Sequence, residues 1–345
     1  KHRLKNAQLN REHIKLEVSE KMATSVLHPQ TEDCRHDPTT HSDGPRLADD
    51  DRAQILEAKE RETGDLPPEL REKARLELRE DQGLREDALA QMRHFIEKHP
   101  AIKMCRTDAP FLLRFLRTKK YSIPQACSML ERYLTIRQMY PQWFQKLDPL
   151  DAKIAAVIDA GYLVPLPKRD AEGRRVVLSC MGRFDPHTYD SCVMARVHSL
   201  IVELLLDEPR SQLLGYAHVN DEAGMQMPHV SLWSLTDVRI MLNCIQNSTP
   251  MRHKRTHFVN IPAYGFHRTC EDLTKHVDPA ILPKEYGGTV PLKDMIEELK
   301  RNLLKHRDAL LALDDMKIDL YALEKNDLTQ DIHSTAGSFR KLELD

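Results

Sequence analysis

The sequence has little cysteine and no long apolar stretch, and both absences narrow the class of protein. Its 345 residues contain seven cysteines, an odd number, scattered singly without a CxxC pair or zinc-ligand spacing. This usage is typical of reduced thiols in a cytoplasmic protein and predicts neither a disulfide framework nor a metal site. No apolar run approaches the roughly 20 residues that a membrane-spanning helix requires. The N-terminal segment has no apolar signal core, and a start at Lys1 is typical of a fragment or a processed chain.

An excess of charge of one sign is also missing. The chain carries 51 Lys and Arg residues against 53 Asp and Glu residues, a formal net charge of −2. Because nucleic acid is held mainly by an excess of basic charge, this balance argues against nucleic acid as a partner. Any electrostatic function must therefore come from local patches.

The motifs of common enzyme classes do not occur. We find no G-x-S-x-G nucleophile elbow, P-loop, G-x-G-x-x-G turn or HExxH helix. Asp221 and Glu222 follow an expected strand, where α/β enzymes often keep acids, but the family resemblance described below implies a structural turn there. His253 and His257 on an extended strand would point to the same face about 13 Å apart, too far to share a metal. We expect no enzymatic activity, no cofactor and no metal site.

The first half of the chain divides into a polar extension and a helical module. Residues 1–62 are rich in histidine and turn formers, and we expect them to be disordered, with a metal-binding tail as the less favoured alternative. Residues 63–145 show helical periodicity, with Asp108 and Ser122 as expected N-caps. The basic residues of this module are expected on a solvated face, with membrane contact as the alternative: Arg114, Arg117, Lys119 and Lys120.

The second half alternates between β-rich and helical segments. We expect strands at 175–181, at 215–221 and around Phe258, separated by helices over 193–205 and 232–246. This order is typical of a mainly parallel sheet with crossover helices, so the expected class is α/β. Residues 165–173 are expected to be a turn-rich connection. The expected domain covers 150–292, and 293–345 should form a C-terminal helix and a loose tail.

Four motifs in a fixed order carry a resemblance to a known family. They are DAPFLLRFLRTK at 108–119, Glu208-Pro209 with Gln212 and Gly215, a basic strand at 250–262, and LPKEYGG at 282–288. With these motifs the chain resembles the CRAL-TRIO lipid-binding family, in the branch of cellular retinaldehyde-binding protein, α-tocopherol transfer protein and clavesin. The resemblance extends from about residue 66 to residue 292.

The resemblance implies an apolar pocket with the sheet as its floor and helices as its walls and gate. The same residues would also build an ordinary core, which is the favoured interpretation without the resemblance, and sequence does not separate the two. The residues expected to line the pocket are Val177, Cys180, Met181, Leu204, Ala217, Val219, Met225, Met227, Trp233, Met241, Phe258 and Ile261.

A second implied site is basic. Members of the family bind phosphoinositide head groups at the positions of Arg252 and Lys254, so the resemblance implies the same here, with Arg255 beside them. On an extended strand Arg252 and Lys254 point the same way. The corner after this strand is expected to be structural rather than part of a ligand site, through Pro283, Glu285, Gly287 and Gly288.

The gate is where the sequence departs from the family. Only 21 residues separate Asn260 from Leu282. The family usually has a longer segment there, with a gate helix, a basic helix and another strand. We therefore expect a shortened gate region.

Taken together, the resemblance implies non-enzymatic binding and intracellular transfer of a small hydrophobic lipid, such as a retinoid or a tocopherol. The partners would be that lipid and an anionic membrane carrying phosphoinositides, phosphatidylinositol bisphosphate among them. The implied location is the cytoplasm, with transient visits to endosomal, Golgi or plasma membranes. Two alternatives stay open: a membrane-trafficking adaptor with a vestigial or open pocket, and a hydrolase on an α/β scaffold.

Overall fold

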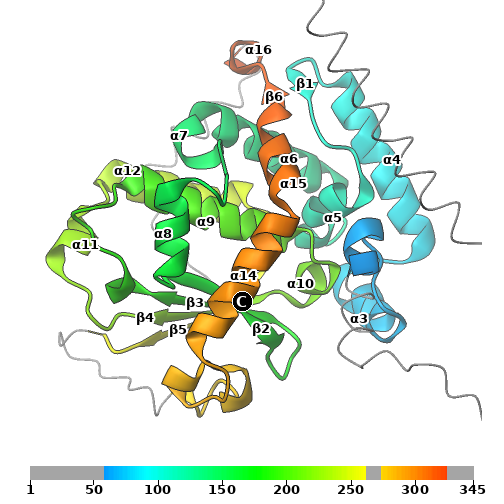
Figure 1. Cartoon of the computed structure of the whole chain (residues 1–345). Helices are drawn as coiled ribbons and strands as arrows, with labels where there is room; N and C mark the ends of the chain where they lie inside the picture. Colours follow the sequence, from blue (N-terminus) through cyan, green and yellow to red (C-terminus); the bar gives the residue numbers. More distant parts are fainter. Residues whose placement is uncertain (1–57, 262–272, 325–345) are drawn as a thin grey trace, which may run out of the picture. The chain divides into compact units, whose positions relative to one another are not determined.

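The computed structural model describes residues 58–261 and 273–324 (Figure 1). The loose tail from about residue 325 and most of the expected disordered extension lie outside these ranges. Residues 58–63 are helical, so the extension ends earlier than predicted. Their contacts explain the difference: Glu60 accepts two hydrogen bonds of 2.9 Å from Arg210, and Arg61 donates one of 2.8 Å to the carbonyl of Leu204.

A four-stranded sheet forms the centre of the second half of the described chain. Its strand order is β2-β3-β4-β5, in which β2 pairs antiparallel with β3 and the other two pairings are parallel. This confirms the expected mainly parallel α/β sheet. The strands are β2 Leu163–Arg169, β3 Arg175–Cys180, β4 Tyr216–Asp221 and β5 His253–Val259.

Strand β2 occupies part of the segment, residues 165–173, that the sequence predicts to be a turn-rich connection. Pro165 nevertheless pairs with Val177 across the antiparallel ladder. Proline lacks an N–H, so it is tolerated in a strand that forms the edge of a sheet. The turn itself is shorter than predicted and places Gly173 at φ +77° before β3.

Helices connect and flank these strands (Figure 1). The crossover from β3 to β4 contains α9 and α10, and the crossover from β4 to β5 contains α11, α12 and a π-helical turn. Helix α14 packs on α8 and β2. Their bounds are α8 Ala152–Asp159, α9 Ser191–Leu206, α10 Pro209–Leu214, α11 Met227–Ser231, α12 Leu235–Asn243, η2 Cys244–Ser248, α14 Leu292–Lys305 and α15 Arg307–Leu311.

The helical module expected at 63–145 is seen at one side of the sheet (Figure 1). Asp108 caps α5 as predicted, since its carboxylate accepts from the N–H of Phe111 at 3.2 Å. Ser122 occupies the N-cap position of α6, but its side chain makes no capping hydrogen bond. The helices are α3 Pro68–Leu78, α4 Gln82–Lys98, α5 Ala109–Thr118, α6 Ile123–Met139 and α7 Pro141–Phe144.

A small second sheet joins this module to the end of the described chain. Strand β1, Ile102–Met104, pairs antiparallel with β6, Lys317–Ile318, just before α16, Leu320–Glu324. Neither strand was predicted, because each is too short to show an alternating pattern. The buried apolar residues of the module and of the sheet form one continuous hydrophobic core.

The basic face expected on α5 is wrong at two positions. The side chains of Arg114 and Arg117 are 1% and 0% exposed, so neither lies on a solvated face nor reaches a membrane. Arg117 donates to Glu80 at 2.6 and 2.9 Å and to Gln212 at 2.8 Å. A buried guanidinium needs such partners, and they come from segments that local sequence does not bring together.

Candidate functional site

A cavity of about 430 Å³ lies between the sheet and the helices that cross it. One wall comes from β4 and β5, and the others come from α6, α7, α9, α12 and η2. The lining residues are Tyr133, Ile136, Arg137, Trp143, Phe144, Ala195, His198, Ser199, Val202, Glu203, Leu206, His218, Asn220, Met241, Cys244, Ile245, Thr249, Met251, His253 and Thr256.

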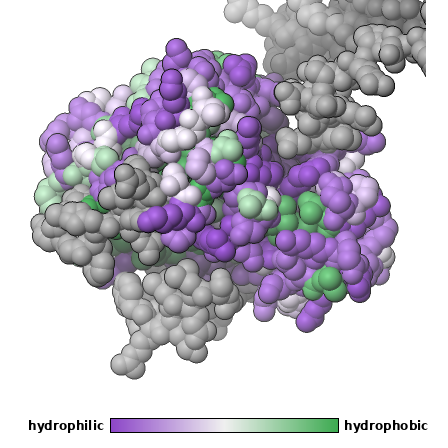
Figure 2. Space-filling view, turned by 90° about the horizontal axis from the view of Figure 1, so that it is seen from below, coloured by the Kyte–Doolittle hydropathy of each residue, from purple (hydrophilic) through white to green (hydrophobic). Residues whose placement is uncertain are grey.

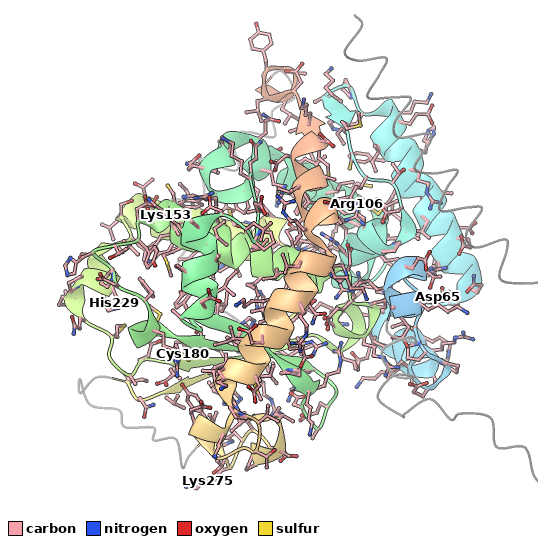
Figure 3. All side chains as sticks on the ribbon, viewed as in Figure 1. Asp65, Arg106, Lys153, Cys180, His229 and Lys275 are labelled. Atoms are coloured by element: carbon pink, nitrogen blue, oxygen red, sulfur yellow. The ribbon has the colours of Figure 1, made fainter. Side chains whose placement is uncertain are left out.

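The face of the sheet that meets this cavity is set by strand alternation. Successive side chains of a strand point to opposite faces. His218 and Asn220 line the cavity, so Ala217 and Val219 must point to the other face. Cys180, labelled in Figure 3, also lies on that other face, where its Sγ is 3.3 Å from the hydroxyl of Tyr286. The prediction that Cys180, Ala217 and Val219 line a pocket is therefore wrong for this cavity.

The structure describes all of the predicted pocket residues. Of these, Met241 alone lines this cavity. Met227 and Phe258 are 71% and 45% exposed, and Leu204 is buried in the core. Trp233 contributes indirectly, because its ring packs edge-on against Trp143, a lining residue, with 6.3 Å between centroids. The remaining predicted residues do not reach the cavity: Val177, Met181, Met225 and Ile261.

A charged cluster forms one part of the cavity wall. Glu203 of α9 accepts hydrogen bonds from Arg114 at 2.7 Å, from the hydroxyl of Tyr133 at 2.8 Å and from Arg137 at 3.1 Å. Arg114 also donates to Asp207 at 2.6 Å, and it helps to hold the pKa of that carboxyl well below its usual range against the effect of burial. Each acid of the cluster is thus matched by a guanidinium. Arg106, labelled in Figure 3, ion-pairs with Asp207 at 3.2 Å.

Three histidines line another part of the cavity. Burial, together with the neighbouring rings of His253 and His198, lowers the pKa of His218 to about 3. Burial also lowers the pKa of His253, and it lowers that of His198 despite a 2.9 Å contact between His198 Nδ1 and the carbonyl of Met194. All three rings are therefore uncharged at neutral pH.

The two histidines of β5 do not share a face as predicted. The register shifts at the start of β5, where Tyr216 pairs with His253 but Ala217 pairs with Arg255. This bulge reverses the alternation, so His253 meets His218 in the cavity while His257 is aligned with Val219 on the opposite face. No group of three or more metal-ligating side chains occurs in the described part of the chain.

The polar residues of the cavity are the part that sequence reasoning missed. His218 and Asn220 alternate with apolar residues along β4, and this pattern was a usable signal that one face of the strand is polar. Thr256 lies on the same face, since it is aligned with His218. His253 gave no such signal, because its position depends on the bulge.

The basic cluster expected around β5 divides into two places. Arg252 donates to the carbonyl of Leu213 and lies 3.5 Å from Glu77, and its side chain is only 8% exposed. Lys254 lies near the same carboxylate; its pKa is lowered by burial and then by Arg252, with smaller effects from Lys120 and Lys73.

Arg255 lies apart from this cluster. Its guanidinium is 3.6 Å from Glu172, in the turn between β2 and β3. It is also aligned with Ala217, on the face of the sheet that does not meet the cavity. Lys254, in contrast, lies beside Arg252 and Glu77 and is exposed.

The corner from Pro283 to Gly288 has the geometry of a structural element. Gly287 has φ +91°, and a Cβ on Gly288 would lie 1.7 Å from the carbonyl oxygen of Leu282. Glu285 accepts from the N–H of Leu292 at 2.9 Å, which satisfies a donor at the start of α14. Pro283 precedes the short 3-10 helix η4, Lys284–Tyr286.

The predicted shortened gate cannot be placed, because residues 262–272 lie outside the described residues. In the described part of the chain, no helix is both long and apolar enough to cross a membrane. Figure 2 shows one face of the molecule covered mostly by hydrophilic residues, with hydrophobic ones in small groups.

Comparison with known families agrees with this geometry. A model of the CRAL/TRIO domain matches residues 159–265, which contain the sheet and most of the cavity lining. A model of the Pinta-like UBA domain matches residues 81–154, within the helical region. Over these residues the chain is therefore similar to a CRAL/TRIO domain preceded by a helical UBA-like region, which confirms the resemblance.

Among individual proteins the chain is similar to the clavesins. It is 29% identical to Clavesin-1 of Pongo abelii over 251 residues, which cover 67% of this chain and 71% of that protein. It is 28% identical to Clavesin-2 of Homo sapiens over 284 residues, which cover 75% of this chain and 86% of the relative.

Proposed function

We propose that this chain binds a small hydrophobic lipid, such as a retinoid or a tocopherol, and carries it between membranes without catalysing a reaction. The observation that carries the proposal is the cavity, whose lining from Ala195 to Thr256 falls inside the region that matches the CRAL/TRIO domain. Its volume of about 430 Å³ lies within the usual range of small-molecule sites. Its walls combine apolar side chains with a few polar groups, as such sites do.

Docking at a membrane is the second part of the proposal. Three cations, Lys73, Arg252 and Lys254, lie near Glu77 between α3 and β5, and Lys120 lies near Lys254. An excess of cations over carboxylates attracts the phosphates of a phosphoinositide head group. Because Arg252 is already engaged, Lys254 is the group that a phosphate would meet first, with Arg255 at the margin of the site.

The setting of this activity is also proposed. The protein would act in the cytoplasm and visit endosomal, Golgi or plasma membranes that display phosphoinositides. The alternative, a membrane-trafficking adaptor with a vestigial pocket, has less support because a cavity of this size is present.

Solvent extraction of the purified chain, followed by mass spectrometry, tests the proposal. We expect a stoichiometric lipid in the native chain and its loss in Ser199→Phe, which places a ring inside the cavity from α9. Leu76→Phe, on a side chain that is 68% exposed, is the matched control and should keep the lipid.

Other outcomes separate the alternatives. A native chain that yields no lipid and binds no fluorescent lipid probe would support the adaptor. Turnover of a lipid ester would support a hydrolase. Melting temperatures of both variants must be measured, because a ring added to a packed wall costs stability when the wall cannot adjust.

A further inference from the structure

Two histidines meet on the floor of the cavity. Nδ1 of His253 lies 3.0 Å from Nε2 of His218, and the ring centroids are 4.9 Å apart with 34° between the planes. The bulge at the start of β5 makes this contact, since regular alternation from Thr256 would turn His253 away. His218 and His253 both line the cavity, so a molecule inside it can reach the pair.

The protons of this pair can be counted. A neutral imidazole carries one N–H and one lone pair, and a hydrogen bond between the rings uses one of each. The outer nitrogens, Nδ1 of His218 and Nε2 of His253, then carry one N–H and one lone pair between them. If both tautomers reverse, the two outer nitrogens exchange roles and the net charge does not change. Either outer nitrogen can therefore donate to a carbonyl or accept from a hydroxyl.

The charges of the cavity can be counted in the same way. The lining contains Arg137 and Glu203, which are 3.1 Å apart. Arg137 also donates to the carbonyl of Phe144 at 2.8 Å, and Glu203 has two further donors. A carboxylate or phosphate entering the cavity would meet no uncommitted cation among the lining residues. Burying a charge without a partner is costly, so the cavity disfavours a charged ligand.

The geometry points to an uncharged lipid that ends in a hydroxyl or carbonyl group, with its oxygen hydrogen-bonded to the His218–His253 pair. This inference rests on the proposed lipid-binding function and deepens it by assigning the polar anchor. Because the pair reverses its tautomers, the same site accepts an alcohol and the corresponding aldehyde. Asn220 and Thr256 lie on the same face of the sheet and complete the polar end of the cavity.

A matched ligand series tests the assignment on the native chain. A fluorescent lipid probe is displaced, in the presence of EDTA, by four lipids that share one hydrocarbon chain and end in an alcohol, an aldehyde, a methyl group or a carboxylate. One added hydrogen bond should make the alcohol and the aldehyde about three- to tenfold stronger competitors than the hydrocarbon. Of the three oxygen-bearing lipids, the one that ends in a carboxylate should be the weakest competitor.

Variants locate the effect. His218→Leu and His253→Leu should lose the advantage of the alcohol and aldehyde while keeping the affinity for the hydrocarbon. His187→Leu, on an exposed residue outside the cavity, is the matched control and should behave as the native chain. Should either Leu variant fail to fold, the ligand series on the native chain still decides. In the native chain, ¹⁵N NMR of the His218 and His253 rings should show one pair of tautomers with the alcohol bound and the opposite pair with the aldehyde bound.

Several results would overturn the inference. Equal competition by the alcohol and the hydrocarbon would remove the anchor but leave the proposed function intact, since the probe still binds. Preference for the carboxylate would contradict the charge count. An affinity that rises with added Zn²⁺ and falls with EDTA would make the pair a metal site instead. If the native chain binds neither the probe nor any of the four lipids, the proposed function itself fails, and the assignment of the pair fails with it.

Discussion

Arg114 of α5 donates a hydrogen bond of 2.7 Å to Glu203 of α9, and this contact joins the helical module to the wall of the cavity. Neither residue is exposed by more than a few per cent. Glu203 lines the cavity and Arg114 does not, so Arg114 supports this wall from behind, whereas α6 and α7 of the same module line the cavity directly. The module is thus part of the structure that shapes the cavity, although the family model for the CRAL/TRIO domain begins at residue 159.

Replacing Arg114 by alanine should destabilise the chain strongly. The change leaves the carboxylates of Glu203 and Asp207 without their main partner, and breaking a buried ion pair costs about 3–5 kcal/mol. Urea unfolding monitored by circular dichroism measures the loss. Lys153→Ala, on the exposed side of α8 (labelled in Figure 3), should change the free energy of unfolding by less than about 0.5 kcal/mol. Similar losses in both variants would show that the Arg114 pairs contribute nothing specific.

Gly288→Val should destabilise the corner after the sheet. A Cβ there would lie 1.7 Å from the carbonyl oxygen of Leu282 and 2.8 Å from that of Pro279, and backbone cannot give way as a flexible side chain can. We expect a melting temperature lower by several degrees, with or without lipid. Gly83→Ala is the control, because Gly83 lies in the first turn of α4, where an added Cβ would make only an ordinary contact of 3.6 Å with Asp81 Oδ1, and the change should stabilise by up to about 1 kcal/mol. Normal stability with lost lipid binding would assign the corner to the ligand site.

Sequence patterns over a few neighbouring residues predicted the helices and strands that depend on such patterns. Alternation and helical periodicity found β3, β4 and β5 and the crossover helices, and the charge and shape of Asp108 found the start of α5. Which face of the sheet meets the cavity is decided by packing between distant segments. A choice that is wrong by one residue exchanges Ala217 for His218 and turns an apolar floor into a polar one.

Burial of charge is the other property that local sequence does not show. Arg114 and Arg117 lie in a stretch of leucine and phenylalanine. In such a stretch, the sequence does not distinguish a buried basic residue from one on a solvated face. Their partners Glu203 and Glu80 are 89 and 37 residues away in the chain. The bulge that brings His253 to His218 is likewise a relation between two strands, and β5 alone does not contain it.

Reversing the charge of Lys254 should weaken binding to anionic membranes. A basic residue close to such a surface is worth about 1 kcal/mol. Because exchange for glutamate changes the charge by two units, it should cost about 2 kcal/mol and lower the affinity for phosphoinositide-containing liposomes more than tenfold. Co-sedimentation at two salt concentrations measures this, and salt should weaken the binding of the native chain as well.

Arg255→Glu is the matched control for that experiment, since Arg255 pairs with Glu172 away from the cluster around Glu77. It should weaken binding less than Lys254→Glu does. Equal effects of the two substitutions would mean that both residues face the membrane. Arg252→Glu is a poorer test, because Arg252 also holds the carbonyl of Leu213 and its loss would disturb the fold.

The stability of the chain should fall in mild acid because of the cavity histidines. The pKa of His218 is about 3 in the folded chain, below the value of about 6.5 that an unfolded histidine has. Between these values the unfolded chain binds one proton more at this position, so this contribution to stability is fully present above pH 6.5 and decreases as the pH falls toward 3. The slope is at most about 1.4 kcal/mol per pH unit for one histidine. The groups that face His218 are His253 and His198, whose pKa values are lowered too and add in the same direction.

Urea unfolding of the native chain and of His218→Leu between pH 7.5 and pH 4.5 measures this dependence. The variant should lose the hydrogen bond to His253 and be less stable than the native chain at pH 7.5. Its stability should nevertheless decrease less steeply toward pH 4.5, by up to the slope of one proton, so that the two curves approach each other in acid. His187→Leu, on an exposed turn, should keep the native slope. Parallel curves for the native chain and His218→Leu would mean that His218 takes up its proton as readily in the folded chain as in the unfolded one, and that the ring is not held uncharged in the cavity.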